Sequence, residues 1–431
     1  MVYTPPVLGS LLSLLVLAAP EVLDLSSGPD VGALVQRVWS ANAELQAARV
    51  KVATARAEAA RAGFLPNPTL DLAVNTIPVG PLNPPNLADP LLNVPNLGGG
   101  LSVLLEVGKR GPRQDATRAA ARAATLDAVE LLRQKVLSAE EAISDIAAAE
   151  VRVATLIQLA EDALRLTTLE RARADKGDTS ALDADRAQLE EEGVFTSLGE
   201  ARESLSEGLR TCTDVVGVPC LPFNDWRAAA AWLERRFEAT ATKVEERPDL
   251  KSLQAQQATA EAQQLLAERR WAPDPTLRLG YLHDRFVISG NQQNSLAVSL
   301  AFPLNLFDHG QADAAAAAVA VAAARATRER LLGNATSQLQ RLHEQQRNIG
   351  ARQKRLRDHS LPLAASVVER LNAAVTRGAA PLQELLLARR TYAELLLTAN
   401  DLDRASFRLR VARVRVTGSA MPLPPELTDD Q

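Results

Sequence analysis

The segment Pro66-Asn67-Pro68-Thr69-Leu70-Asp71-Leu72 returns 207 residues later as Pro273-Asp274-Pro275-Thr276-Leu277-Arg278-Leu279. Farther along, Ala174-Asp175-Lys176-Gly177-Asp178 matches Val375-Thr376-Arg377-Gly378-Ala379 with an offset of 201 residues. Landmarks that recur in the same order at nearly constant spacing indicate an internal repeat, in which one supersecondary unit is made twice.

The pattern around these landmarks predicts helix, strand, strand, long helix, glycine turn and long helix in each repeat. The first repeat spans 31–220, with a β-hairpin at 69–107 and a tip turn near 177. The second spans 247–418, with a β-hairpin at 276–302 and a tip turn near 378. An inter-repeat segment occupies 221–246, and a C-terminal tail occupies 419–431.

The long segments before the tip turns predict long helices. No proline lies between Pro112 and Pro219, so a continuous helix is expected from Pro112 to Lys176, whereas Pro362 should break or kink its counterpart. Such helices are not stable alone in water and must pack along their length. Their Ala-rich and Leu-rich positions favour antiparallel coiled packing, although a soluble helical bundle would show the same periodicity.

Each predicted strand alternates between apolar residues on one face and small or charged residues on the other. The second face carries Asp71, Glu106 and Arg278, which are expected to face a wet lumen. This alternation is typical of outer-membrane barrels, although a half-buried soluble sheet produces it too. Gly98-Gly99-Gly100 is expected to be a loop. The apolar faces consist of Leu70, Leu72, Val74, Leu101, Val103, Leu105, Val107, Leu277, Leu279, Tyr281, Leu296, Val298, Leu300 and Phe302.

Four strands are too few to close a barrel, and lipid does not tolerate open sheet edges. If the strands span a membrane, several identical chains must each donate four of them. The predicted fold is therefore mainly α, with long antiparallel helices and four membrane strands per chain.

The composition excludes several other classes of protein. Apolar residues make up 46% and charged residues 23%, which argues against wholesale disorder. The net charge of −4 provides no basic excess for nucleic acid. No stretch of 18 apolar residues is present, so a helical membrane transporter is excluded.

The N-terminal run from Leu8 to Ala19 has the length of a signal-peptide core, with small residues that favour cleavage after Ala18. Residues 1–18 are therefore predicted to be a signal peptide. A buried N-terminal helix is the alternative.

The two cysteines, Cys212 and Cys220, are separated by seven residues, with Gly217 and Pro219 between them. This spacing predicts a small disulfide in an oxidising compartment. Two unrelated free thiols are the alternative.

From about Val31 to Gly418 the chain resembles the TolC-type outer-membrane efflux channel family. The resemblance is carried by the paired strand starts, by Arg247-Pro248-Asp249-Leu250, by Gly108-Lys109-Arg110 and by Phe302-Pro303-Leu304-Asn305-Leu306-Phe307-Asp308-His309-Gly310. It implies a homotrimer with a twelve-stranded barrel in the outer membrane, a helical tunnel through the periplasm and a small equatorial belt. The segment from Glu106 to Arg113 resembles the Czc-type cation-efflux branch.

This resemblance implies a passive exit duct of a tripartite efflux system. Its partners would be a periplasmic adaptor, an inner-membrane pump, expected to be proton-driven, and outer-membrane lipid. Two alternatives remain: an exit channel for type I protein secretion, or a soluble coiled-coil scaffold.

No constellation for catalysis is evident in the sequence. His283, His309, His343 and His359 lack ligand spacing, and neither a phosphate loop nor a nucleophile elbow occurs. We therefore expect no enzyme activity, no cofactor and no metal site.

The family places function at the helical tips. Asp183 and Glu384 each lie six residues past a tip glycine, where an inward carboxylate would form a ring that attracts cations. Both are candidates for a periplasmic gate; the alternative is a solvated helix surface. The tip turns would meet an adaptor through Lys176, Gly177, Asp178, Arg377, Gly378 and Ala379.

Overall fold

The computed structural model describes residues 22–81, 89–235, 240–241, 243–285 and 292–428. The chain divides into two compact units. The sheet unit comprises Val50–Leu126 and Asp249–Arg330, and the helical unit comprises Met1–Arg49, Asp127–Pro248 and Leu331–Gln431. Each unit thus draws residues from both repeats. The predicted signal peptide lies outside the described residues.

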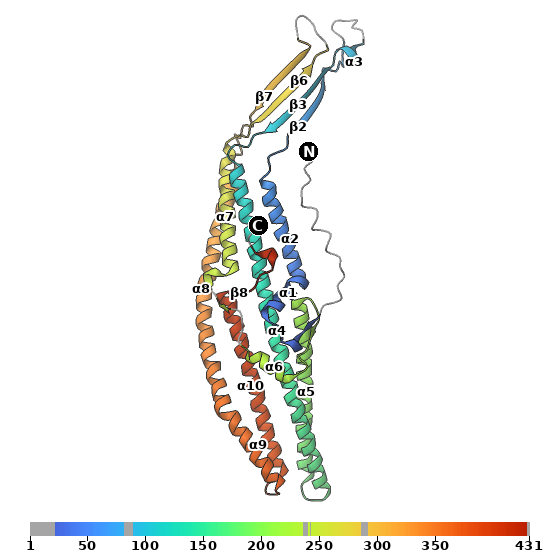
Figure 1. Cartoon of the computed structure of the whole chain (residues 1–431), viewed down its shortest axis with the longest axis vertical. Coiled ribbons are helices and arrows are strands. Elements are labelled where there is room, and N and C mark those ends of the chain that lie inside the picture. Colours follow the sequence, from blue (N-terminus) through green and yellow to red (C-terminus); the bar gives the residue numbers. More distant parts are fainter. Residues whose placement is uncertain (1–21, 82–88, 236–239, 242, 286–291, 429–431) are drawn as a thin grey trace. The chain divides into compact units, whose positions relative to one another are not determined.

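The elements follow the predicted order in both repeats (Figure 1). The first repeat contains α2 (Ala43–Ala62), β2 (Thr69–Asn75), β3 (Asn96–Leu104), α4 (Arg110–Asp175) and α5 (Ala181–Val216). The second contains α7 (Pro248–Glu268), β6 (Thr276–His283), β7 (Asn294–Ala301), α8 (Gln311–Arg355), α9 (Leu361–Thr376) and α10 (Leu382–Thr417). Shorter elements are β1 (Leu23–Asp24), α1 (Val31–Ala41), α3 (Pro90–Asn93), β4 (Cys220–Leu221), α6 (Trp226–Glu234), β5 (Thr240–Ala241) and β8 (Ser419–Ala420).

Proline sets the difference between the two long helices. In α4, Pro112 lies in the first turn, where its missing N–H costs no hydrogen bond, and the helix continues for 66 residues. In the second repeat, Pro362 follows a π-helical segment, Leu356–Ser360, that separates α8 from α9. The predicted break or kink at Pro362 takes the form of this local change in winding: the helix continues through the π turn, and the wider turn accommodates the lost backbone hydrogen bond.

The four long strands form one antiparallel sheet in the order β2-β3-β6-β7. Its register aligns Leu70, Leu101, Leu279 and Val298 in one row across the sheet. Strands β2 and β7 are its two edges.

The expectation that Gly98-Gly99-Gly100 forms a loop is wrong, because these residues belong to β3. Glycines carry no side chains, so they erased the alternation that identifies a strand. A Cβ at Gly100 would lie 3.0 Å from Nε of Arg278, on the neighbouring strand. Residues 105–107, expected to be strand, follow the end of β3.

In the helical unit, α4 and α10 run between α5 on one side and the lower part of α8 with α9 on the other (Figure 1). Helix α5 buries one stripe of mostly small residues spaced by three, four or seven: Ala184, Ala187, Val194, Leu198, Ala201, Gly208, Cys212 and Val216. Gly208 permits close approach, since a Cβ there would lie 3.1 Å from Ile146 of α4. A narrow stripe of this kind is the pattern of a helix that packs against one neighbour.

Two short strand pairs and the inter-repeat segment with α6 complete the helical unit. Strand β1 pairs with β4, and β5 pairs with β8. Cys212 of α5 and Cys220 of β4 form a disulfide. The rings of Trp232 on α6 and Phe407 on α10 lie 4.7 Å apart, centre to centre, which ties this segment to α10.

Candidate channel and tip sites

The sheet has one polar face, on which three side chains meet. Nε of Arg278 lies 3.6 Å from the Asp71 carboxylate, and the Ser102 hydroxyl donates a hydrogen bond of 3.1 Å to the same carboxylate. Arg278 and Asp71 lie on strands β6 and β2, separated by β3, and Gly100 leaves the space that their approach requires. This face therefore carries the paired opposite charges of Asp71 and Arg278, and their position in a lumen stays a prediction.

The opposite face of the sheet is apolar and exposed. Leu72, Leu296 and Val298 have 78%, 77% and 72% of their surface accessible. In this chain the leucine face is therefore not the core of a half-buried soluble sheet. Exposed apolar area on this scale marks a surface made for lipid or for another apolar partner.

Glu106 does not lie on the sheet. It follows β3, its side chain is mostly buried, and it forms an ion pair with Arg113 near the start of α4. The prediction that Glu106 faces a lumen from a barrel strand is wrong, because β3 ends at Leu104 and the chain then turns toward the helix.

The two tip turns have the same backbone hydrogen bonds. Gly177 and Gly378 adopt left-handed conformations, with φ of 77° and 70°. The Asp178 N–H donates to the Arg173 carbonyl, and the Ala379 N–H donates to the Ala374 carbonyl, each over 2.8 Å. Bonds of this kind satisfy the last carbonyls of a helix and end it at glycine. Both turns lie at the same end of the helical unit (Figure 1).

Asp183 and Glu384 have different surroundings despite their equivalent positions. The carboxylate of Asp183 accepts hydrogen bonds from the Ser180 and Thr179 hydroxyls at the start of α5, and these bonds lower the pKa of Asp183. Glu384 is exposed in the first turn of α10, and no ion pair joins it to another described residue. Asp183 therefore already has a capping role, whereas Glu384 is free to act elsewhere.

Near the tips, arginines of α10 bind carboxylates of the first repeat. Nη1 of Arg389 lies 2.9 Å from Asp162 on α4, and Arg390 forms an ion pair with Glu190 on α5. The sequence pattern did not identify these pairs, because each joins residues at least 200 positions apart.

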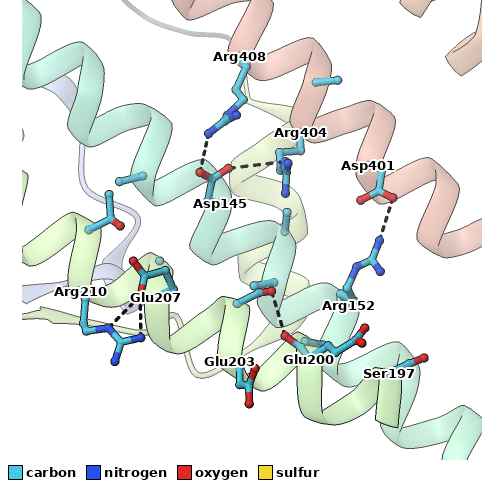
Figure 2. A pocket seen from close by; sticks show the side chains of 18 residues that line it. Asp145, Arg152, Ser197, Glu200, Glu203, Glu207, Arg210, Asp401, Arg404 and Arg408 are labelled. Atoms are coloured by element: carbon cyan, nitrogen blue, oxygen red, sulfur yellow. Dashed lines mark hydrogen bonds and ion pairs between the residues drawn. The ribbon is translucent and has the colours of Figure 1, made fainter. Parts of the chain in front are cut away.

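A groove of about 1070 Å³ lies between α5 and α10 over α4 (Figure 2). On its floor Asp145 binds Arg408 at 2.6 Å, while Arg152 binds Asp401 at 2.9 Å. Burial raises the pKa of Asp145, against the attraction of Arg408 and Arg404. The four arginines of the groove all lie beside carboxylates, so the groove has no spare positive charge to hold an anion.

Neither a metal-binding cluster nor a membrane-spanning helix occurs in the described part of the chain. No group of three or more His, Cys, Asp or Glu side chains there is arranged to hold a metal ion. None of the described helices combines the length and apolar character needed to cross a bilayer.

The chain is similar in structure to solved outer-membrane channels. The structure of the outer-membrane channel OprN is 18% identical, covers 92% of this chain and 91% of its own, and gives a TM-score of 0.67. That of CusC is 15% identical, covers 91% and 92%, and scores 0.69. That of the outer membrane protein VceC from Vibrio cholerae is 18% identical, covers 90% and 96%, and scores 0.68.

No family model and no curated protein matches the sequence. The structural likeness extends over nearly the full length of both partners in each comparison. The chain has the fold of the TolC-type outer-membrane channels.

Proposed function

We propose that the protein is the outer-membrane exit duct of an efflux system and conducts cargo passively. The observation that carries this proposal is the four-stranded sheet, which exposes a leucine face and leaves both edges, β2 and β7, open. Lipid accepts an apolar face but not an open edge, so the edges require partners. The similar structures support the same function, since OprN is an outer-membrane channel, CusC forms a transmembrane channel and VceC is an outer membrane protein.

The partners are two further copies of the chain. Three copies would supply twelve strands, and β7 of each copy would pair with β2 of the next. A closed barrel has no edge, and its strands would place the leucines toward lipid and Asp71 with Arg278 toward the lumen.

The internal repeat provides the register of this pairing. Inside the chain, the second strand of the first repeat pairs with the first strand of the second repeat, so that Gly100 opposes Gly280 and Leu101 opposes Leu279. The equivalent residues at the junction between copies are Ser299 opposite Ala73 and Leu300 opposite Leu72. This register keeps small residues opposite small ones and leucine opposite leucine on the correct faces.

The helices would extend this pore through the periplasm to the tip turns. There the turns around Gly177 and Gly378 would meet a periplasmic adaptor that joins the duct to an inner-membrane pump. Export of proteins by a type I system would use the same duct. Co-purification with a proton-driven pump or with an ABC exporter distinguishes these two possibilities.

Glu384 is our candidate for a cation-attracting ring at the tip. Glu384→Ala should raise single-channel conductance or lower cation selectivity. Asp183→Ala is the matched comparison, and it should instead weaken the start of α5, because Asp183 belongs to the helix cap. If Glu384→Ala leaves both conductance and selectivity unchanged, the ring is not formed by this residue.

The decisive experiment combines fractionation with planar-bilayer recording. We expect the mature protein in the outer-membrane fraction, as a trimer that produces stable conductance steps. A monomer that remains soluble without detergent and never conducts would contradict the proposal and favour a soluble scaffold.

A further inference from the structure

The outer sides of the helical unit carry opposite charges. Helix α5 contains nine carboxylates and three arginines. Residues 331–355 of α8 contain one carboxylate and five lysines or arginines. Figure 1 shows α5 and α8 on opposite sides of α4 and α10, so these two charged surfaces do not meet within one chain.

The charges on α5 form a stripe, and four of its members, Glu200, Glu203, Glu207 and Arg210, also line the groove shown in Figure 2. Its members follow a spacing of three and four residues, which places them on one face of a helix. That face lies opposite the stripe that α5 buries, and every member is exposed. The α5 stripe consists of Glu200, Glu203, Glu207, Arg210 and Asp214.

A matching stripe occupies the exposed side of α8. Arg341, Glu344, Arg352 and Arg355 are separated by three, eight and three residues, which again places them on one face. All four are exposed. None has an ion-pair partner within 4.0 Å among the described residues, and the same holds for Glu200, Glu203 and Asp214 of α5. We call this group the α8 stripe.

The two stripes agree in the number of residues that separate them from the tip glycines, with the π turn Leu356–Ser360 included in the count for α8. Glu200 lies 23 residues from Gly177, and Arg355 lies 23 residues from Gly378. Glu203 and Arg352 each lie 26 residues from their tip glycine.

The agreement continues farther from the tips. Asp214 and Arg341 each lie 37 residues from their tip glycine. Each stripe contains one residue whose charge is opposite to that of the other members, Arg210 on α5 and Glu344 on α8. These two residues lie 33 and 34 residues from their tip glycines.

A ring of copies brings these positions together. Rotation about a ring axis leaves the height of every residue along that axis unchanged, so a contact between neighbouring copies joins residues at equal distances from the tips. The two tip turns lie at the same end of the helical unit (Figure 1). With α5 and α8 on opposite sides, α5 of one copy would meet α8 of the next.

The junction between the two repeats inside the chain also pairs carboxylates with arginines. Most of its ion pairs join a carboxylate of the first repeat to an arginine of the second, as in Asp145 with Arg408 and Glu141 with Arg415. The outer sides repeat this arrangement: Glu200, Glu203, Asp214 and the α8 stripe have no ion-pair partner among the described residues, whereas Arg210 pairs with Glu207 on its own helix.

We propose that the α5 stripe of one copy binds the α8 stripe of a second copy, and that matched ion pairs set the order and height of neighbouring copies. The pairs are Glu200 with Arg355, Glu203 with Arg352, Arg210 with Glu344, and Asp214 with Arg341. The inference rests on the proposed trimeric duct, and the partner it names is another copy of this chain. Exposed pairs contribute modestly to affinity, so their main effect is on specificity and on the choice of register.

Charge reversal tests the pairing. Glu203→Arg should lower trimer assembly about tenfold at low salt, because each of the three junctions exchanges an attraction for a repulsion. Arg352→Glu should do the same, and the combination of both should restore assembly. The matched control combines Glu203→Arg with Arg341→Glu, which lies at a different height and should not restore it.

A second measurement does not depend on charge. A short bismaleimide should join Glu203→Cys to Arg352→Cys between copies, whereas Glu203→Cys with Arg341→Cys should remain unlinked.

Assembly of the charge-reversal variants is measured by light scattering of the detergent-extracted full chain at 50 mM and 500 mM NaCl, with Glu192→Lys as an exposed control on α5.

The results separate this inference from the function on which it rests. Rescue by the matched pair alone, together with the matched cross-link, supports the stripes. If Glu203→Arg assembles and conducts like the wild type, or if the mismatched pair restores assembly equally well, the proposed pairing of the stripes is wrong. The proposed duct would be unaffected by either result. A wild-type chain that is neither trimeric nor conducting would instead overturn the duct.

Discussion

The junction between the two repeats inside the chain is paired and hydrogen-bonded, whereas the outer sides of the repeats are exposed. At the internal junction, β3 pairs with β6 over eight residue pairs, and α10 binds α4 through ion pairs and a hydrogen bond from Asn400 to the Ala148 carbonyl. On the outer sides, β2 and β7 are sheet edges, while α8 is exposed along most of its length.

Helices α4 and α8 show the difference most clearly, because they are equivalent by repeat. Leu132, Leu137, Ile143 and Ile146 of α4 are almost wholly buried, whereas the buried apolar residues of α8 are Ala317 and Ala335. Since both helices are Ala-rich, the contrast lies in their neighbours. A helix that cannot be stable alone and buries so few apolar residues against its own chain requires further neighbours from another.

The largest expected effect is the covalent joining of the two sheet edges. Ser299→Cys with Ala73→Cys should form disulfides between copies under oxidation, because the repeat places these residues opposite each other and opposed strand residues lie within disulfide reach. Non-reducing electrophoresis should show dimers and trimers that disappear with reductant. Ser299→Cys with Asn75→Cys is shifted by two residues along β2 and should link poorly; equal linking would contradict the register.

The next largest effect concerns the core. Ile143→Ala should lower the free energy of unfolding by about 2–5 kcal/mol, because it leaves a cavity in a fully buried site. Val319→Ala on α8 is the comparison: its side chain is 69% exposed, and its loss should cost less than about 0.5 kcal/mol in the separated chain. Denaturant unfolding in detergent measures both, and equal losses would remove the contrast between α4 and α8.

A smaller effect is expected for ion pairs. Arg408→Ala should lower the free energy of unfolding of the monomeric chain by about 1 kcal/mol. The substitution removes the guanidinium that lies 2.6 Å from the part-buried carboxylate of Asp145. Arg341→Ala should leave the separated chain unchanged, since Arg341 is exposed and has no ion pair within the described chain. The same unfolding measurement applies, and a larger loss for Arg341→Ala would show that Arg341 has a partner inside the chain.

The smallest effect is a change in pH dependence. Burial raises the pKa of Glu150 on α4 above its ordinary value of 4.5, although its carboxylate accepts a hydrogen bond of 2.6 Å from the Phe223 N–H. The folded chain therefore holds the proton more tightly than the unfolded chain, and stability falls as pH rises from about 4.5 through the folded pKa. Glu150→Gln should flatten this part of the stability curve; an unchanged slope would show that another group causes it.

Much of the fold follows from the sequence pattern, and the exceptions have physical causes. The repeat, the element order, the irregular helix at Pro362 and the leucine alternation could be predicted, because glycine, proline and period-two patterns act locally. The start of β3 was missed because Gly98-Gly99-Gly100 has no side chains to alternate. Glu106 was misplaced because the alternating pattern continues past Leu104, where β3 ends. In the structure Glu106 forms an ion pair with Arg113 instead of lying on the sheet.

The candidate sites divide in the same way. Asp71 and Arg278 were assigned to a polar face from alternation alone, but their approach across β3 depends on Gly100 and on the strand order. Asp183 and Glu384 are equivalent in sequence position, yet Ser180 and Thr179 give only Asp183 a role in a cap. Their part in a gate stays a prediction.

By itself the sequence determined the repeated unit, the lengths of its helices and the two faces of its strands, because these properties depend on residues close together along the chain. Only the tertiary structure decided which carboxylate meets which arginine, which strands become edges and which sides of the helices have no neighbour. Those outcomes depend on the packing of segments more than 100 residues apart, and no local pattern encodes the distance between them.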